Sequence, residues 1–354
     1  MRFVHDNLPQ RVCFGSGQAA EHVAREAGRL GASRAMVISS PREAARAAEV
    51  TAGAPVVLHY HDVVMHVPAE VAERARAAAA GARADVVVAL GGGSATGLAK
   101  AIALTSGLAV IAVPTTYAGS EATAVWGLTE GDVKTTGTDP AVLPRSVVYD
   151  AALTLSLPAG LSVASGLNAL AHCVDALWGP GADPVNAAFA TEGIRALAAG
   201  LPRVAADPAG LPGREDALYA AYMSAVAFAS AGSALHHKIC HVLGGKYNLP
   251  HAQTHATVLP YVLAFNGPAA PAAEARIAAA FGSGTALAGL QDLRARLDAP
   301  RALRDYGLAE ADIPAAAAAI VPAVPPSNPR PVSAASLERL LRAAWSGASP
   351  DQAA

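Results

Sequence analysis

Histidines at helical spacing are the residues of this sequence best suited to chemistry. Three pairs are spaced four residues apart: Asn168 with His172, His237 with His241, and His251 with His255. This spacing places both side chains of a pair on one face of a helix. A single histidine on an apolar helix is usually structural, whereas several in one region indicate a site for proton transfer or metal binding. The residues in question are Asn168, His172, His237, His241, His251 and His255.

Three imidazoles and one oxygen ligand would suit zinc or ferrous iron. In this sequence the set would be His172, His237 and His251, with Asn168 as the oxygen ligand. A neutral amide is a much poorer ligand than a carboxylate, and it leaves the site without negative charge. We therefore expect no tightly bound metal.

A glycine-rich turn is the strongest signal for a phosphate ligand. Gly91, Gly92, Gly93 and Ser94 follow an apolar stretch at 85–90 and precede a helical stretch. Glycines let the backbone approach a ligand closely, and a helix N-terminus offers free N–H groups to a pyrophosphate. We expect Ser94 both to cap this helix and to donate a hydrogen bond to phosphate.

A second loop, residues 114–121, follows another apolar run, where open α/β sheets bind their ligands. Its candidate cofactor contacts are Thr115, Thr116, Tyr117 and Ser120.

A third cofactor position follows the apolar run that ends at Ser39. An acidic residue there would hold the ribose 2′-hydroxyl of NAD and repel the phosphate of NADP. The chain instead has Ser40, a proline and then Arg42, so we expect Ser40 to contact the cofactor and NADPH to be accepted as well as NADH.

The elements that must position these residues fall into two classes. Short apolar runs alternate with helical stretches through the first half, which predicts a parallel sheet covered on both faces. From residue 158 onward the chain reads almost entirely as helices. The sequence therefore predicts an α/β Rossmann-like N-terminal domain over residues 1–157 and an all-α C-terminal domain over 158–354. The predicted strands are 35–39, 55–59, 85–90, 109–113 and 145–149.

Composition excludes several classes of protein. With 53% hydrophobic residues and a formal net charge of −2, the 354-residue chain is neither disordered nor basic enough to suggest nucleic acid or an anionic membrane as a partner. No run of eighteen apolar residues lacks charge, so no membrane span is expected. The three cysteines have no disulfide or zinc-ribbon spacing, which favours the reduced cytoplasm.

These motifs together resemble the iron-containing (group III) alcohol dehydrogenase family. The resemblance rests on GGGS at 91–94, PTT at 114–116, GSE at 119–121, NALAH at 168–172 and the histidines at 237, 241 and 251. It implies the dehydroquinate synthase-like fold, a nicotinamide cofactor, a homodimer, and a place near the cofactor for Lys134.

Within that family the sequence most resembles the maleylacetate reductase branch, in stretches 91–100, 127–144, 237–256 and 328–331. Gly97 replaces the family's acidic residue in the glycine loop, and Asn168 replaces its metal-binding aspartate. This closer resemblance implies reduction of the conjugated C=C bond of maleylacetate to 3-oxoadipate in aromatic-compound degradation, with NADH or NADPH and without a metal. The implied catalytic residues are His172, His237, His241 and His251.

Among these histidines, His241 is our first choice as proton donor, because the family's corresponding residue is not a metal ligand. The substrate would be a dicarboxylate, for which Lys134, Lys238 and Lys246 are candidate cationic contacts.

The loss of a carboxylate ligand agrees with reduction of an alkene. Hydride addition to a ketone places charge on one alkoxide oxygen, where a metal helps greatly. Addition to an alkene conjugated with a ketone gives an enolate, whose delocalised charge imidazole or ammonium donors can stabilise.

Three alternatives remain open. They are a metal-dependent alcohol or hydroxy-acid dehydrogenase of the same family, a lyase of the sugar-phosphate cyclase type, and a relative with a changed substrate or no activity. Asn168 counts against the first, and the lack of clustered basic residues counts against the second.

Overall fold

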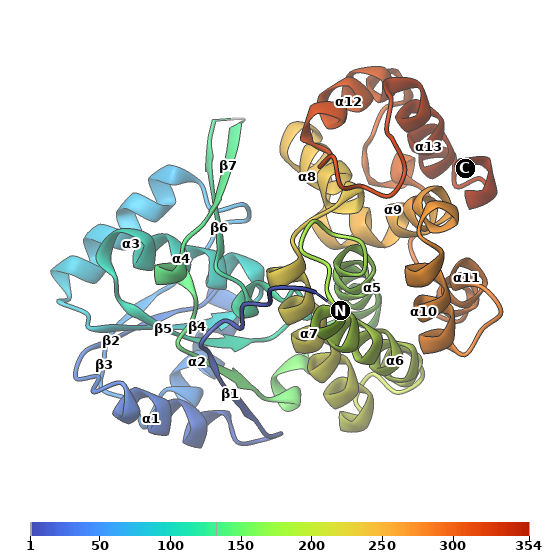
Figure 1. Cartoon of the computed structure of the whole chain (residues 1–354). Helices are drawn as coiled ribbons and strands as arrows, with labels where there is room; N and C mark the ends of the chain where they lie inside the picture. The colour runs from blue at the N-terminus through green and yellow to red at the C-terminus, as the bar shows by residue number, and fades with distance from the viewer. Residues whose placement is uncertain (1, 132, 354) are drawn as a thin grey trace. The chain divides into compact units, whose positions relative to one another are not determined.

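The computed structural model describes residues 2–131 and 133–353, and it divides into two compact units (Figure 1). The side chains of Val133, Lys134 and Ala353 also lie outside the described part. One unit is Leu8–Leu157, and the other combines Met1–Asn7 with Pro158–Ala354. The predicted fold class, an α/β domain followed by a helical domain, is confirmed.

The α/β unit is built on a six-stranded parallel sheet with the order β1-β8-β5-β4-β2-β3. The interior strands β8, β4 and β2 are buried throughout, because helices cover both faces and leave no side for polar residues. The strands are β1 (Arg11–Phe14), β2 (Ala35–Ile38), β3 (Val56–Tyr60), β4 (Val86–Gly91), β5 (Ala109–Pro114) and β8 (Ser146–Tyr149).

Alternate residues of these strands enter two separate cores. Met36 and Ile38 of β2 pack with α3 (Ala69–Gly81) and α4 (Gly93–Ser106) on one face. Val37, between them, packs with α1 (Ala19–Arg29) and α2 (Ala44–Val50) on the other. Figure 1 shows the two helix pairs on opposite sides of the sheet.

Some elements of this unit were not predicted. The edge strand β1 is short and polar-flanked, and α2 is a brief alanine-rich helix. An antiparallel hairpin, β6 (Val125–Glu130) with β7 (Val133–Thr138), forms a second small sheet. These elements lack the unbroken apolar runs by which the five predicted strands were found.

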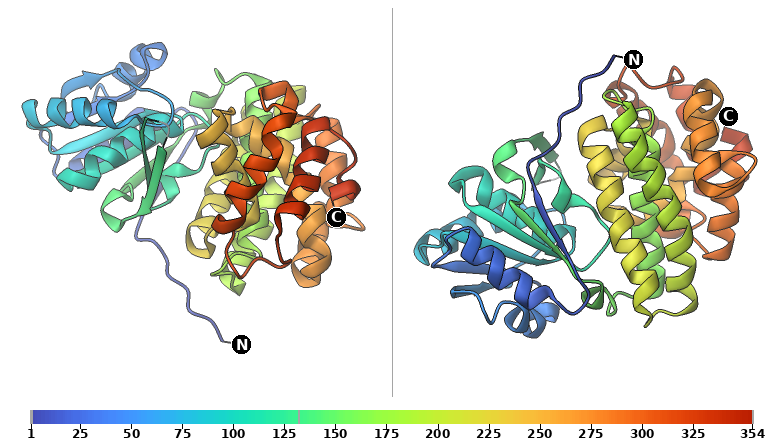
Figure 2. Two further views of the ribbon diagram at one scale, coloured as in Figure 1. Left: turned by 90° about the horizontal axis from the view of Figure 1, so that it is seen from above. Right: turned by 60° about the horizontal axis from the view of Figure 1, so that its bottom comes forward.

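The helical unit packs around α5 (Ala159–Ala176), which is buried along nearly its whole length. Helix α5 contacts α6, α7 and α9, and α6 runs beside α7 (Figure 2). The remaining helices are α6 (Pro184–Ala206), α7 (Leu211–Ala231), α8 (Leu235–Tyr247), α9 (His251–Asn266), α10 (Pro271–Phe281), α11 (Ala286–Arg296), α12 (Ile313–Ile320) and α13 (Ala334–Ser346).

The Pro/Gly-containing stretch 211–213, which the sequence suggests as a joint between helices, is instead the first turn of α7. A proline is tolerated there because its missing N–H would have no helical partner. The alanine run at 315–319 lies in α12, as the high helix propensity of alanine predicts.

The first residues of the chain group with the helical unit rather than with the α/β unit assigned to 1–157. The ring of His5 contacts the Asp183 carboxylate at 2.8 Å. Asp183 also caps α6 by accepting from the backbone N–H groups of Val185 and Asn186. The contact between His5 and the distant Asp183 thus holds the N-terminal segment to the helical unit. Local sequence patterns cannot predict a contact between residues so far apart in the chain.

Among the described residues, no single helix has the length and hydropathy of a membrane span. Helices α7 and α8 meet those criteria only when taken together, and a 100° bend separates them.

Candidate active site

Helices α5, α8 and α9 bring the four predicted catalytic histidines into one connected group of rings. His172 and His237 stack with centroids 5.0 Å apart, and His241 lies 6.0 Å from His237. His251 joins through His255, whose ring is 4.3 Å from His251 and 5.0 Å from His237. His172 and His237 are buried, whereas His241 and His251 are exposed.

Asp175 orients His237 and was missed in the sequence. Its carboxylate accepts from the His237 ring Nδ1 at 2.7 Å, from the backbone N–H groups of Ala234 and His237, and from the Trp178 indole. Because Asp175 holds the Nδ1 proton, a neutral His237 carries its lone pair on Nε2. The signal was available, since Asp175 follows His172 by three positions and so shares its helix face.

Burial sets the charge of the two inner histidines. It lowers the pKa of His172 and of His237 well below the usual value, and neighbouring histidines lower both further. The Phe228 ring packs against them, 4.8 Å from His172 and 4.2 Å from His237. Both imidazoles are therefore neutral at physiological pH.

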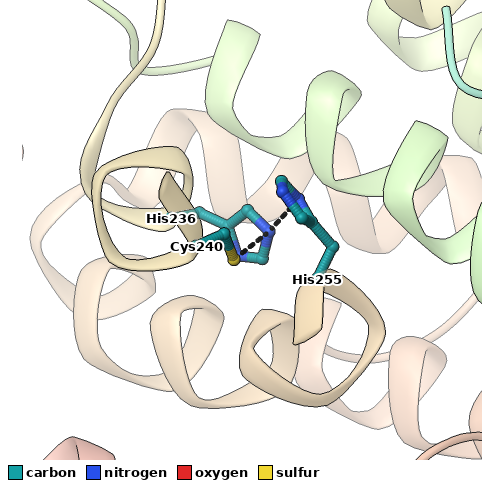
Figure 3. Close-up of side chains that lie close together, drawn as sticks. All are labelled: His236, Cys240 and His255. Carbon is teal, nitrogen blue, oxygen red and sulfur yellow. Dashed lines mark hydrogen bonds between the residues drawn. The ribbon is translucent and has the colours of Figure 1, made fainter. Parts of the chain in front are cut away.

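The rings of His236 and His255 pack edge-on against His237. With Cys240 they form a second layer of polar residues (Figure 3). His236 Nε2 and His255 Nδ1 are 3.0 Å apart, and the Cys240 thiol lies 3.6 Å from the same nitrogen of His236. All three are buried. Burial lowers the pKa of both histidines and raises the pKa of Cys240, so the layer is a hydrogen-bonded chain of neutral groups.

The glycine loop of the α/β unit has the form of a phosphate cradle. Helix α4 begins at Gly93 with Gly92 as its N-cap, and no side chain caps it. Gly91 has φ +147°, which disfavours any side chain, and a Cβ on Gly92 would lie 3.0 Å from the Thr116 methyl. The uncapped first turn therefore has N–H groups available for a pyrophosphate.

Ser94 lies inside the first turn of α4, so the prediction that its side chain caps this helix was wrong. Its predicted contact with phosphate stays a prediction.

Lys100 of α4 holds the second loop in place and was also missed. Its ammonium donates to the main-chain oxygens of Ser120 at 2.6 Å, Thr123 at 2.8 Å and Val125 at 2.8 Å. The side chain is fully buried, which lowers the pKa of Lys100 to about 7. The helix that begins at the glycine loop is thereby tied to the second loop.

The predicted contacts of the second loop differ in exposure. Thr116 and Ser120 are half-buried, Thr115 is nearly buried, and Tyr117 is fully buried. The Lys134 side chain lies outside the described residues. The cofactor roles of these five residues stay predictions.

The cationic candidates Lys238 and Lys246 both lie on α8, the helix that carries His237 and His241. Lys246 is exposed and Lys238 is half-buried. Their contact with a dicarboxylate stays a prediction.

Comparison with known families covers both units. Residues 9–151 match the model of the iron-containing alcohol dehydrogenases, and residues 162–345 match the model of the C-terminal part of the same family. The chain belongs to the iron-containing alcohol dehydrogenase family. The resemblance drawn from the motifs is therefore confirmed.

Individual members of the family match over nearly the whole chain. A maleylacetate reductase from Sphingobium indicum is 46% identical, covering 99% of this chain and 99% of its own. A solved iron-containing alcohol dehydrogenase from Corynebacterium glutamicum has a TM-score of 0.98 at 57% identity, covering 100% of this chain and 99% of its own. A maleylacetate reductase from Agrobacterium tumefaciens has a TM-score of 0.94 at 44% identity, covering 99% and 100%.

The family's name implies iron, which stands against the expectation of a metal-free site. In the described part of the chain, the only three His, Cys, Asp or Glu residues with ligand atoms within 4.8 Å of one another are His236, Cys240 and His255. The histidines predicted as the metal set do not form such a group. Metal-bound histidines almost always donate their second N–H, yet His236 Nδ1 and His255 Nε2 have no partner among the described atoms.

The oxygen donor of the predicted metal set, Asn168, is also unsuited to iron. Asn168 Oδ1 is buried with no partner among the described atoms, and it is neutral. The nearby carboxylate of Asp175 is already held by four N–H groups. Of these residues, His237 has the arrangement of a metal ligand, with its Nδ1 held by Asp175 and a buried Nε2 that has no partner among the described atoms. A neutral amide beside imidazoles supplies no negative charge, so the predicted set fits a tightly bound divalent iron poorly.

Proposed function

We propose that this protein uses NADH or NADPH to reduce the conjugated C=C bond of maleylacetate to 3-oxoadipate. The cluster of four histidines with an amide in place of the carboxylate is the observation that carries the proposal. Curated maleylacetate reductases at 43–46% identity over nearly the whole chain support it. The Corynebacterium relative at 57% identity is named only by its family, so the substrate needs a direct test.

The cofactor, when bound, supplies the hydride. In the proposal it is held by the α/β unit, through the uncapped first turn of α4 and the hydroxyls of Thr115, Thr116 and Ser120. Ser40, Tyr117 and Lys134 complete the proposed contacts. The helical unit supplies the groups that bind the dicarboxylate and move the proton.

Hydride addition to the alkene carbon distal to the ketone leaves an enolate that must be stabilised and then protonated. We assign the proton transfer to His241, which is exposed and whose ring contacts His237. His237 can exchange a proton only at Nε2, because Asp175 holds its Nδ1. His251, the other exposed histidine, and His172 are assigned to the enolate oxygen.

The test is NADH oxidation with maleylacetate by enzyme pretreated with a strong chelator. Rapid turnover is the expected result, and it supports both the substrate and a metal-free mechanism. No turnover with or without added zinc or ferrous iron would reject maleylacetate as the substrate.

A metal-dependent alcohol or hydroxy-acid dehydrogenase is the second candidate, favoured by the iron in the family's name. It predicts activity that the chelator removes and added metal restores.

We further propose that the protein acts in the cytoplasm as a homodimer. Sedimentation at micromolar concentration would contradict the dimer if it gave a monomer mass.

A further inference from the structure

An acidic side chain lies among three of the residues predicted to bind the cofactor. Glu43 ends a short 3₁₀ turn, Pro41–Glu43, that follows strand β2. Its carboxylate accepts from the Thr115 hydroxyl at 2.8 Å and from the Ser40 hydroxyl at 3.3 Å.

The same carboxylate lies directly against the glycine loop. A Cβ built on Gly91 would be 3.0 Å from Glu43 Oε2, so no side chain separates the carboxylate from that backbone. Ser40, Gly91 and Thr115 follow or end strands β2, β4 and β5, which are neighbours in the sheet. Glu43 therefore places a negative charge where the carboxyl ends of three adjacent parallel strands meet, the edge at which such sheets bind dinucleotides.

We propose that Glu43 makes this protein selective for NADH over NADPH. This inference rests on the proposed nicotinamide cofactor, and it narrows the expectation that either NADH or NADPH is accepted. The two cofactors differ only in a phosphate on the adenosine ribose, so a fixed carboxylate at this edge discriminates against the more negative of them.

The neighbouring Arg42 does not cancel this effect. Arg42 is exposed, so solvent and salt screen its attraction for a phosphate. Glu43 is half-buried and held by two hydroxyls, which fixes its position and keeps its charge close to the loop.

The experiment measures dissociation constants of NADH and NADPH by fluorescence, with full-length protein and no maleylacetate. The variants are Glu43→Gln, which keeps the shape and removes the charge, and Arg42→Gln. Glu49→Gln, an exposed carboxylate of α2, is the matched control. We expect the wild type to bind NADH at least about 10-fold more tightly than NADPH. Glu43→Gln should remove most of that ratio by tightening NADPH, while Glu49→Gln leaves it unchanged.

Several outcomes would overturn the inference. Equal binding of the two cofactors by the wild type would do so, as would an unchanged ratio in Glu43→Gln. A ratio that responds only to Arg42→Gln would assign the selectivity to that residue instead. Binding is measured without substrate, so NADH binding without maleylacetate turnover would reject the proposed substrate and leave the selectivity standing. Failure to bind either cofactor would reject both.

Discussion

Two polar side chains of α5 show how single residues set the chemistry of the histidine cluster. Asp175 is an interior carboxylate surrounded by four N–H donors. Asn168, on the same helix, has a buried Oδ1 with no partner among the described atoms. A carboxylate at position 168 would lack the donors that Asp175 has, so it would need a cation nearby. The amide removes that need.

Changing Asn168 to Asp should therefore raise metal affinity and lower stability without metal. We expect zinc to bind at least about 10-fold more tightly in Asn168→Asp than in the wild type, measured by titration calorimetry. The metal-free variant should lose a few kcal/mol in the free energy of unfolding, because it buries an uncompensated charge.

Asn186→Asp provides a matched control for that experiment. Asn186 of α6 is also fully buried with an Oδ1 that lacks a partner among the described atoms, but it belongs to no group of histidines. It should lose stability without gaining zinc affinity. Equal zinc binding by Asn168→Asp and the wild type would contradict the account of Asn168.

Changing Asp175 to Asn tests whether the orientation of His237 matters for catalysis. The Asp175 oxygen that faces His237 Nδ1 also accepts from the backbone N–H groups of Ala234 and His237. An amide therefore either keeps its oxygen there without the negative charge that holds the Nδ1 proton, or turns its NH₂ toward Nδ1 at the cost of those backbone bonds and moves the ring proton to Nε2. We expect kcat to fall about 100-fold with a smaller change in the KM for the substrate. Steady-state kinetics measure this, and an unchanged kcat with intact fold would show that the hold of the carboxylate on His237 is unimportant.

At the scale of elements, α4 connects the two candidate cofactor loops of the α/β unit. Its first turn follows the glycine loop, and its Lys100 reaches the main chain of the second loop. The ammonium is fully buried, and the nearby Glu121 only partly offsets the cost of that burial. Because burial lowers the pKa of Lys100 in the folded state, the stability of the protein depends on pH.

The pH dependence from Lys100 can be predicted in sign. Between pH about 7 and 10.5 the unfolded lysine is protonated and the folded one is not, so the free energy of unfolding rises with pH. Below pH 7 the lysine is protonated in both states, so the protein lacks this additional stability. The total increment in the free energy of unfolding between pH 7 and 10.5 is on the order of 5 kcal/mol at most.

Denaturant titrations of the wild type and Lys100→Met across this range measure the increment. The variant should lack the rise, whereas Lys246→Met, an exposed lysine of α8, should retain it. A wild-type curve that is flat from pH 7 to 10 would contradict the assignment.

The sequence predicted the elements with unbroken apolar runs and the histidines with helical spacing, because both patterns are local. It could not find Glu43, whose partner Thr115 lies 72 residues away, or the clamp from Lys100 to the second loop. Those contacts depend on the order of strands in the sheet, which local periodicity does not contain. Asp175 could have been found, since it shares a helix face with His172.

At the scale of the whole molecule, the two units have separate cores and carry different candidate groups. The candidate cofactor loops lie in Leu8–Leu157, and all four predicted catalytic histidines lie in Pro158–Ala354. A net charge of −2 offers no general attraction for a dicarboxylate, so binding of the substrate must come from local cations and hydrogen bonds.

This division predicts which amides each ligand protects from hydrogen exchange. NADH should protect residues 91–96 and 114–123, because bound phosphate restrains the first turn of α4 and the second loop. A dicarboxylate such as 3-oxoadipate, added with the oxidised cofactor, should further protect the first turns of α8 and α9. At a ligand concentration of about 100 times Kd, exchange that requires ligand release should slow about 100-fold.

Exchange measured by mass spectrometry on the full-length chain tests this, with α13 as the internal reference that neither ligand should affect. Protection of the α8 and α9 turns by NADH alone, with none in the two loops, would place the cofactor on the wrong unit and refute the assignment.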